Sequence, residues 1–355
     1  MIAALFVLPT RGGNGGANSV IQEATALARM GCHIGITVQK KQLADFRNSY
    51  PELASTGIRL HSFGDTADLA KDLAAYDIVV ATIYTSVALI AEAIASVKSR
   101  IKVAYYVQDY EPLFHEADTE AWRAARDSYR LIPGATLFAK TGWLQDIVEQ
   151  NHGVRPEKVA PSIDHGIYYP DIAVPRGELK VAAMLRPSTP RRAPHRTIRV
   201  MARLAQELPS ARFVVFGSDN AVLADMGVEL PAGVENLGRL RRTEVPDLLR
   251  GSDIFIDCSD YQAFGRTGLE AMATGCVPVL PTFGGAHEYA LHERNAYLVD
   301  SRSDQSFVDA VVAFDDLDPG YRAEMRREAL STAAGYSVTA AALSELALFQ
   351  RILGQ

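Results

Sequence analysis

The chain has 355 residues, with 48% hydrophobic and 22% charged side chains, an ordinary composition for a soluble globular protein. This length suits two domains of about 100–200 residues each. The formal net charge of −6 argues against nucleic acid as a general partner. The widely separated Cys32, Cys258 and Cys276 show no metal-ligand spacing, so we expect buried thiols in a reducing compartment.

The amino-terminal residues 2–8 are apolar but lack the basic segment of a signal peptide. No run reaches the roughly 18 apolar residues that a membrane span requires. We therefore expect a cytoplasmic protein. The alternative is peripheral contact with the inner face of the cell membrane, which is suggested by Trp122 and by Arg123, Arg126 and Arg130 after it at near-helical spacing.

The first half alternates between strand and helix patterns. Continuous apolar runs predict buried strands at 2–8, 34–38, 78–81 and 102–107. A glycine loop follows the first strand and precedes a helix, for which Ser19 and Gln22 have capping-box spacing at the start and Gly31 suits the end. Such alternation predicts a parallel sheet with right-handed crossovers.

A second series of elements follows a break. The segment 156–175 contains four prolines and little periodicity, which indicates a linker. Apolar runs then predict strands at 180–185, 213–216, 254–257 and 277–280, and 338–353 has the pattern of an amphipathic helix. We therefore expect two Rossmann-like α/β domains, at 1–160 and 179–335, that face a central cleft. A linker at 161–178 would join them. A helix at 336–355 would follow the second domain, and it could pack on the first.

The segment 260–279 contains the strongest candidate site. Gly265 and Gly268 lie where a helix begins, and we expect them to let the backbone approach a ligand. A helix N-terminus offers free N–H groups and a positive dipole end, which suits a diphosphate. Glu270, about one turn further on, is placed to accept hydrogen bonds from the hydroxyls of a ribose. The alternative is a plain loop before a packing helix.

A basic loop follows the first strand of the second half. Arg186 and Arg191 are five residues apart, with Pro187 and Pro190 stiffening the chain between them. Forked, permanently charged guanidinium groups suit a diphosphate leaving group. The carboxyl end of a strand is where open α/β sheets bind ligands, although a solvated basic loop is the simpler interpretation of any single arginine.

Two further candidates lie in the first half. The glycine loop at 12–16 is in the right context for phosphate but lacks the spacing of the dinucleotide fingerprint. Asp109 and Glu111 follow the strand at 102–107, where they are either catalytic or cap the turn at Pro112. Asp316 and Asp318 form a D-x-D pair in a polar segment away from every predicted strand end, which we interpret as a solvated turn.

The order of these motifs resembles that of the family 4 glycosyltransferases, which have the GT-B fold. The matching pieces are the glycine loop, then residues 161–166, 185–187, 216–217, 237–240, 248–254, the Glu270 segment and 284–288. Residues 106–114 and 186–192 are similar to the rhamnosyltransferase branch that builds bacterial surface glycans of the S-layer type. One departure is Gln262, because the family has glutamates at that position and at Glu270. Glutamine keeps hydrogen bonding but has no titratable proton, so we expect it only to orient a substrate group.

The resemblance implies a retaining transfer without a metal or other cofactor. The resemblance implies a nucleotide sugar as the donor, namely dTDP-rhamnose, and a glycan or a lipid-linked glycan as the acceptor. Arg186 and Arg191 would stabilise the leaving diphosphate, and Asp109 would guide the acceptor hydroxyl. The implied donor-binding residues are Gly13, Gly15, Gly16, Arg186, Arg191, Arg192, Gly217, Leu240, Gln262, Gly265, Arg266, Thr267 and Glu270, and the implied acceptor-binding residues are Gln108, Asp109 and Glu111.

Three other classes of protein remain as alternatives. A nicotinamide-dependent dehydrogenase would carry its acidic ribose ligand in the first domain, whereas Glu270 lies in the second. A sugar-nucleotide epimerase has the same two-domain architecture, because a fold does not determine a function. A catalytically silent nucleotide-sugar binding protein is the third alternative, since Gln262 breaks one expected position.

Overall fold

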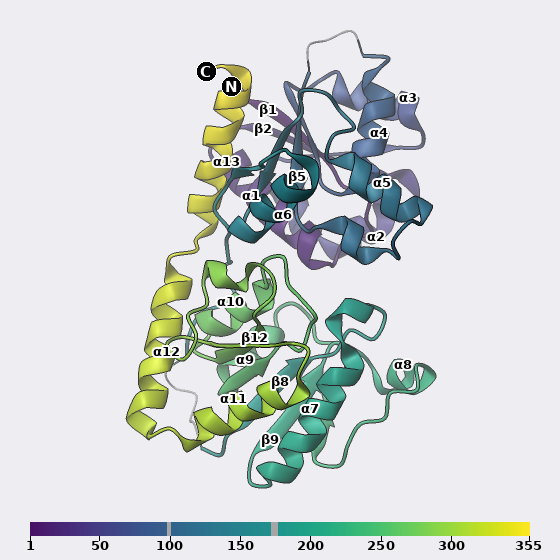
Figure 1. Cartoon of the computed structure of the whole chain (residues 1–355). Coiled ribbons are helices and arrows are strands. Elements are labelled where there is room, and N and C mark those ends of the chain that lie inside the picture. Colours follow the sequence, from purple (N-terminus) through teal and green to yellow (C-terminus); the bar gives the residue numbers. More distant parts are fainter. Residues whose placement is uncertain (98–100, 172–176) are drawn as a thin grey trace. The chain divides into compact units, whose positions relative to one another are not determined.

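The computed structural model describes residues 1–97, 101–171 and 177–355. The chain forms two compact units, Met1–Ser162 together with Ser337–Gln355, and Ile163–Tyr336. Each unit contains one parallel β-sheet and its own helices (Figure 1). The α/β architecture with two parallel-sheet domains that the sequence predicts is therefore confirmed.

Among the described residues, the sheet of the first unit has seven strands, and every adjacent pair is parallel. The four strands predicted from apolar runs are β1, β2, β4 and β5. The sequence did not predict β3, β6 and β7, of which β3 and β7 are partly exposed and β6 has an apolar run of only three residues. In spatial order the strands are β3 (Arg59–Phe63), β2 (His33–Gln39), β1 (Ala3–Val7), β4 (Ile78–Ala81), β5 (Lys102–Val107), β6 (Thr136–Ala139) and β7 (Glu157–Lys158).

The helices of the first unit are α1 (Gly15–Arg29), α2 (Leu43–Ser49), α3 (Thr66–Leu73), α4 (Tyr84–Ile94), α5 (Glu120–Ser128), α6 (Gly142–His152) and α13 (Val338–Leu353). Helix α1 begins earlier than the expected cap at Ser19. Its N-cap is Asn14, whose Oδ1 accepts a hydrogen bond from the Ala17 N–H at 2.9 Å. An asparagine supplies the oxygen that a first turn needs, so the glycine loop leads directly into the helix.

The carboxyl-terminal helix α13 belongs to the first unit, where it packs on α1. It has the bounds predicted from its apolar face. The ring of Phe349 is fully buried, and its centroid lies 6.4 Å from those of Phe6 and Phe138. The last helix of the chain therefore packs in the same hydrophobic core as the first strand.

In the described part of the second unit, the sheet has six strands, all parallel. Its spatial order is β10 (Val234–Asn236), β9 (Arg212–Phe216), β8 (Lys180–Met184), β11 (Ile254–Ile256), β12 (Val277–Pro281) and β13 (Tyr297–Val299). The order reverses between β8 and β11, because the chain leaves β8 toward β9 and later returns to the other side of β8. The carboxyl ends of these two strands therefore form a topological switch point.

The helices of the second unit are α7 (Pro194–Glu207), α8 (Asn220–Asp225), α9 (Val245–Arg250), α10 (Arg266–Ala273), α11 (Asp304–Asp316) and α12 (Pro319–Ala334). Successive strand residues contribute to two cores, as alternation across a sheet requires. Val181 and Ala183 pack in a cluster with apolar residues of α7 and α11. Ala182 packs in another cluster with residues of α9, α10 and α12.

Part of the expected linker folds into the second unit. Ile163 and Tyr168 are buried in the cluster that contains α10, and the Ile163 N–H donates to the Tyr336 carbonyl oxygen at 3.0 Å. Residues 172–176 of the expected linker lie outside the described residues.

Candidate functional site

The switch point of the second unit gathers two loops that the sequence singled out. The loop after β8 carries Arg186 and Arg191, and the loop after β11 carries Asp260 and Gln262. A backbone hydrogen bond joins them, because the Asp260 N–H donates to the Arg191 carbonyl oxygen at 2.8 Å. In open parallel sheets this position is the usual place of a ligand.

The two arginines have different surroundings. Arg186 is exposed, and its Nε donates to Met184 Sδ at 3.0 Å. Arg191 is half-buried in the 3₁₀ turn Pro190–Arg192, and its guanidinium carbon lies 5.9 Å from the centroid of the Tyr261 ring. Arg192 follows in the same turn and is also half-buried. Both Arg186 and Arg191 therefore place positive charge beside the switch point.

Gly217 brings a third loop to this edge of the sheet. It has a φ of +110°, and a Cβ at this position would lie 2.6 Å from the Leu185 carbonyl oxygen. Its N–H donates to the Gly238 carbonyl oxygen at 2.7 Å. Leu240, which we expected at the donor site, is partly buried against the α10 cluster. Glycine is needed at 217 because the loops after β8 and β9 approach each other here.

The start of α10 differs in part from the expectation. Gly265 is the N-cap with a left-handed φ of +79°, and no side chain caps the helix. Gly268, however, faces protein: a Cβ there would lie 2.5 Å from Tyr289 Oη and 2.8 Å from Leu280 Cδ2. Tyr289 Oη also donates to the Gly265 carbonyl oxygen at 2.6 Å. Gly268 therefore permits close internal packing, and the expectation that it lets a ligand approach the backbone is wrong.

Glu270 lies one turn into α10 and is held by its neighbours. Its Oε1 accepts a hydrogen bond from Arg266 Nε at 3.0 Å, and it shares a further hydrogen bond with Tyr168. Burial raises the pKa of Glu270, while Arg266 beside it acts in the opposite direction. Thr267, half-buried, stands between them in the first turn. The carboxylate is thus fixed in position close to the uncapped start of the helix.

Gln262 is turned inward. Its side-chain amide donates to Asp257 Oδ2 and, at 3.2 Å, to Ser259 Oγ, and the residue is only 7% exposed. Its backbone also contacts Gly284, where a Cβ would lie 2.2 Å from the Gln262 carbonyl oxygen. Both amide hydrogens therefore have acceptors in the protein, so any role of this side chain in orienting a substrate would fall to its amide oxygen.

Arg196 is a residue of this region that the sequence analysis did not identify. Its guanidinium group is largely buried, and Nη1 donates at 2.8 Å to both the Cys258 carbonyl oxygen and Asp260 Oδ1. It thereby connects α7 with the loop after β11. Arg196 lies on the helix that follows the basic loop, and this position in the sequence could have indicated that it contacts the same region.

The glycine loop of the first unit is supported by Tyr50. Its Oη accepts a hydrogen bond from the Gly13 N–H at 3.0 Å, and a Cβ at Gly12 would lie 2.7 Å from the ring. Gly15 opens α1 with open space around its Cα, whereas a Cβ at Gly16 would lie 2.7 Å from Gln108 Oε1. Gly12 and Gly13 both have positive φ, which explains the glycines in this turn.

The acidic candidates of the first unit separate into two kinds. Asp109 is half-buried, and its Oδ1 accepts from the Tyr110 N–H at 2.9 Å. Glu111 is 3% exposed and accepts from the Tyr84 N–H at 2.6 Å and from Tyr105 Oη at 3.2 Å. Glu111 thus satisfies the first N–H of α4, and the expectation that it binds an acceptor is wrong. Gln108 Nε2 donates to the Thr82 carbonyl oxygen at 2.9 Å.

The D-x-D pair is structural. Asp316 ends α11, and Asp318 is the N-cap of α12, where its Oδ1 accepts from the Gly320 N–H at 2.8 Å. Within the described ranges, no group of three or more His, Cys, Asp or Glu side chains is placed to hold a metal ion. None of the helices in the described part of the chain combines the length and the apolar character needed to cross a bilayer.

Residues 171–331, all within the second unit, match the family model described as Glycosyl transferases group 1. The second unit is therefore similar to the group 1 glycosyltransferases. The whole chain is similar in structure to Anabaena HepE in its complex with UDP and glucose, with a TM-score of 0.80 and 18% identity over 99% of this chain and 100% of that one. That likeness establishes the GT-B class of fold.

Two curated relatives match over shorter stretches. The lipopolysaccharide core biosynthesis mannosyltransferase LpsB of Rhizobium meliloti is 30% identical over 114 residues, which are 31% of this chain and 32% of the relative. An Escherichia coli galactosyltransferase that uses UDP-Gal and acts on GlcNAc-diphosphoundecaprenol is 24% identical over 171 residues, 46% of this chain and 44% of the relative. The matches thus span less than half of the length of each relative.

Proposed function

We propose that the protein is a glycosyltransferase that moves a sugar from a nucleotide diphosphate donor to a glycan or lipid-linked glycan. The observation that carries the proposal is the switch point of the second unit. There Arg186 and Arg191 lie at the end of β8, and the loop after β11 leads to the uncapped helix that carries Glu270. Cationic groups and a helix start suit a diphosphate, and a fixed carboxylate suits ribose hydroxyls.

The proposed chemistry is a retaining transfer without a metal. The bond between the anomeric carbon and the diphosphate oxygen breaks, and the bonding electrons leave with the diphosphate. The acceptor oxygen then bonds to the anomeric carbon on the same face, while its proton passes to a leaving-group oxygen. Arg186 and Arg191 would stabilise the growing negative charge, and Asp109 would orient the acceptor hydroxyl.

The donor sugar is a separate part of the proposal. The resemblance of residues 106–114 and 186–192 to rhamnosyltransferases favours dTDP-rhamnose, whereas the relatives named above use mannose or UDP-galactose. Lipopolysaccharide and diphosphoundecaprenol glycans in those names support a surface glycan as the acceptor. An acceptor of this kind would be bound to the inner face of the cell membrane, which is why we also propose peripheral membrane contact through α5.

A panel of nucleotide sugars tests the proposal. Purified protein is incubated with dTDP-rhamnose, GDP-mannose, UDP-galactose or UDP-glucose, and release of nucleoside diphosphate is followed with and without lipid-linked acceptor, in the presence of EDTA. We expect one donor to be consumed and the sugar to appear on the acceptor. Interconversion of the free nucleotide sugar would indicate an epimerase instead, and binding of nucleotide without turnover of any donor would indicate a silent binding protein.

A further inference from the structure

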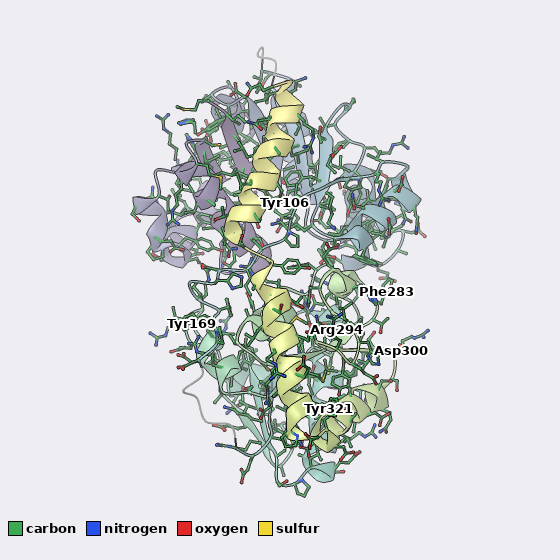
Figure 2. All side chains as sticks on the ribbon, turned by 90° about the vertical axis from the view of Figure 1, so that its left-hand side faces the viewer. Tyr106, Tyr169, Phe283, Arg294, Asp300 and Tyr321 are labelled. Carbon is green, nitrogen blue, oxygen red and sulfur yellow. The ribbon has the colours of Figure 1, made fainter. Side chains whose placement is uncertain are left out.

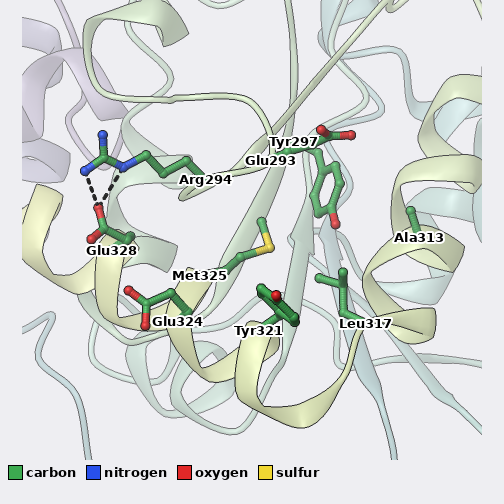
Figure 3. Close-up of a pocket in the computed structure, with 9 residues that line it drawn as sticks. All are labelled: Glu293, Arg294, Tyr297, Ala313, Leu317, Tyr321, Glu324, Met325 and Glu328. Atoms are coloured by element: carbon green, nitrogen blue, oxygen red, sulfur yellow. Dashed lines mark hydrogen bonds and ion pairs between the residues drawn. The ribbon is translucent and has the colours of Figure 1, made fainter.

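The second unit contains a cavity of about 500 Å³ that the proposed transfer does not use. It lies among three elements: α12, the end of α11, and the loop that leads into β13 (Figure 3). Met325, which is buried, lies at the centre of Figure 3, with Leu317 and the ring of Tyr297 beside it. A cavity of this size is in the range of small-molecule sites, which are about 300–1,000 Å³.

This cavity and the switch point lie at opposite edges of one sheet. Tyr297 is the first residue of β13, so it marks the amino end of that strand. Arg186 and Gln262 follow the carboxyl ends of β8 and β11, and all strands of the sheet are parallel. A ligand in the cavity would therefore not occupy the candidate donor site.

One face of α12 presents aromatic and acidic side chains to the cavity. Tyr321, Glu324, Met325 and Glu328 have the spacing i, i+3, i+4 and i+7, which places them on the same side of a helix. Tyr321 is 69% exposed, an unusually open position for a large aromatic ring, and Figure 2 shows it along α12 on the same side of the unit as Arg294. The cavity thus has an exposed ring above a buried apolar floor.

An ion pair and an anchored loop form the polar rim of the cavity. Arg294 Nε donates to Glu328 Oε2 at 3.0 Å, as the dashed lines in Figure 3 show. The loop that carries Arg294 is fixed by Asn295, whose side chain bonds to the Leu291 N–H at 2.7 Å and to Thr332 Oγ1 at 2.9 Å. Preorganised polar groups bind at a lower entropic cost than mobile ones do.

We propose that this cavity is an accessory saccharide-binding site that takes a neutral oligosaccharide. The C–H face of a pyranose ring is apolar and packs on an exposed aromatic ring such as that of Tyr321. Carboxylate and guanidinium groups, here Glu324 and the Arg294–Glu328 pair, bind vicinal hydroxyls through two parallel hydrogen bonds. The three glutamates of the lining outnumber its one arginine, so uronic acids and phosphorylated sugars are disfavoured.

The inference goes beyond the proposed transfer and does not require it. A site at the far edge of the sheet would hold a part of a glycan remote from the reacting sugar. It would therefore raise the affinity for long acceptors without contributing to the chemistry. The test below measures only sugar binding at the cavity. The cavity proposal can therefore fail while the transferase proposal holds, and the transferase proposal can fail while the cavity still binds sugar.

Titration with short sugars, followed at the Met325 methyl group by NMR, tests the site directly. The probes are α-linked mannotriose and maltotriose as neutral sugars, trigalacturonate as an anionic sugar, and a lysine-rich peptide as a ligand of another class. We expect saturable shifts with a neutral sugar at a Kd on the order of 1 mM, which is a weak but measurable affinity. We expect no saturation with trigalacturonate.

Variants separate the site from general surface effects. Tyr321→Ala should weaken binding at least about tenfold, while Tyr321→Phe, which keeps the ring, should stay within about threefold of the unmodified protein. The control is Tyr169→Ala, which removes another exposed tyrosine of the same unit and should change nothing. Arg186→Ala should leave sugar binding intact. The proposal is overturned if the neutral sugars give no saturable shift, if Tyr321→Ala binds as well as the unmodified protein, or if trigalacturonate or the peptide binds more tightly.

Discussion

Arg266 Nε donates a hydrogen bond to Glu270 Oε1 at 3.0 Å, one turn apart at the start of α10. Both side chains are largely shielded, with 15% and 12% of their surfaces exposed. Burial raises the pKa of the Glu270 carboxyl, and Arg266 beside it acts in the opposite direction. It also places one acidic and one basic group at the uncapped end of the same helix.

Substitution of Glu270 should weaken nucleotide binding. Glu270→Gln replaces charge-assisted bonds to the ribose with neutral ones, at a cost of about 1–2 kcal/mol. Glu270→Ala should cost more, and it also leaves Arg266 without this partner. Calorimetric titration with UDP and with its 2′-deoxy analogue measures both effects, and thermal unfolding controls for damage to the fold. The loss should be smaller for the deoxy analogue, so identical losses for both nucleotides would place the ribose elsewhere.

Gln262→Glu should destabilise the second unit. Gln262 donates to Asp257, so a glutamate there would bring two carboxylates into contact and leave the Asp257 oxygen without this donor. We expect a loss of about 1–3 kcal/mol at neutral pH. The carboxyl introduced at 262 would have a raised pKa in the folded protein. The loss of stability due to charge repulsion should therefore be absent in acid and grow as the pH rises above the ordinary glutamate pKa of about 4.3.

Urea unfolding at pH 5 and pH 8 measures this effect. Gln262→Ala is the matched control, because it removes the same hydrogen bonds without adding a charge. Its loss of stability should not change with pH. Equal pH profiles for the two variants would show that repulsion from Asp257 plays no part.

Glu345→Gln should stabilise the first unit at neutral pH. Glu345 on α13 is fully buried beside Lys140, whose Nζ is 3.9 Å away and also pairs with the buried Glu23. Burial and the neighbouring Glu23 raise the pKa of Glu345, while Lys140 opposes the rise. The unfolded chain therefore loses this proton first, and native stability falls as the pH rises above the ordinary glutamate pKa.

The amide that Glu345→Gln introduces would mimic the protonated acid and offer a donor to Glu23 Oε2, which has no hydrogen-bond partner among the described residues. We expect a gain of about 1–3 kcal/mol at pH 8 that disappears toward pH 4. Thermal unfolding across this range measures it. A variant that is less stable than the unmodified protein at pH 8 would show that the ionised carboxylate is the stabilising form.

Helix α5 should bind anionic lipid surfaces. Arg123 and Arg126 of α5 are exposed, as is Arg130 just after the helix ends, and Leu113 and Phe114 are exposed on the turn that packs against the helix. Each arginine near an anionic surface contributes about 1 kcal/mol. The combined change of Arg123 and Arg130 to Glu should therefore reduce co-sedimentation with phosphatidylglycerol vesicles by at least about tenfold. Equal partitioning of the unmodified protein into neutral and anionic vesicles would contradict the prediction.

The sequence predicted those parts of the fold that depend on continuous apolar runs and on glycine. The strands β1, β4, β5 and β8 follow such runs, and Gly217 and Gly265 have the positive φ that favours glycine. The sequence pattern does not show which polar side chains the fold will bury. Glu111 looked like a ligand because it follows a strand, yet its carboxylate caps α4. Tyr168 lies in a proline-rich segment, and only the folded chain brings it to Glu270.

The central claim is that the loop after β8 binds the donor diphosphate, and titration calorimetry with UDP and dTDP tests it most directly. Arg186→Ala and Arg191→Ala should each weaken binding by about 1.5–3 kcal/mol, roughly 10- to 150-fold. The control is Arg212→Ala, since Arg212 is an exposed arginine at the amino end of β9. Full affinity in both loop variants, or an equal loss in the control, would contradict the account.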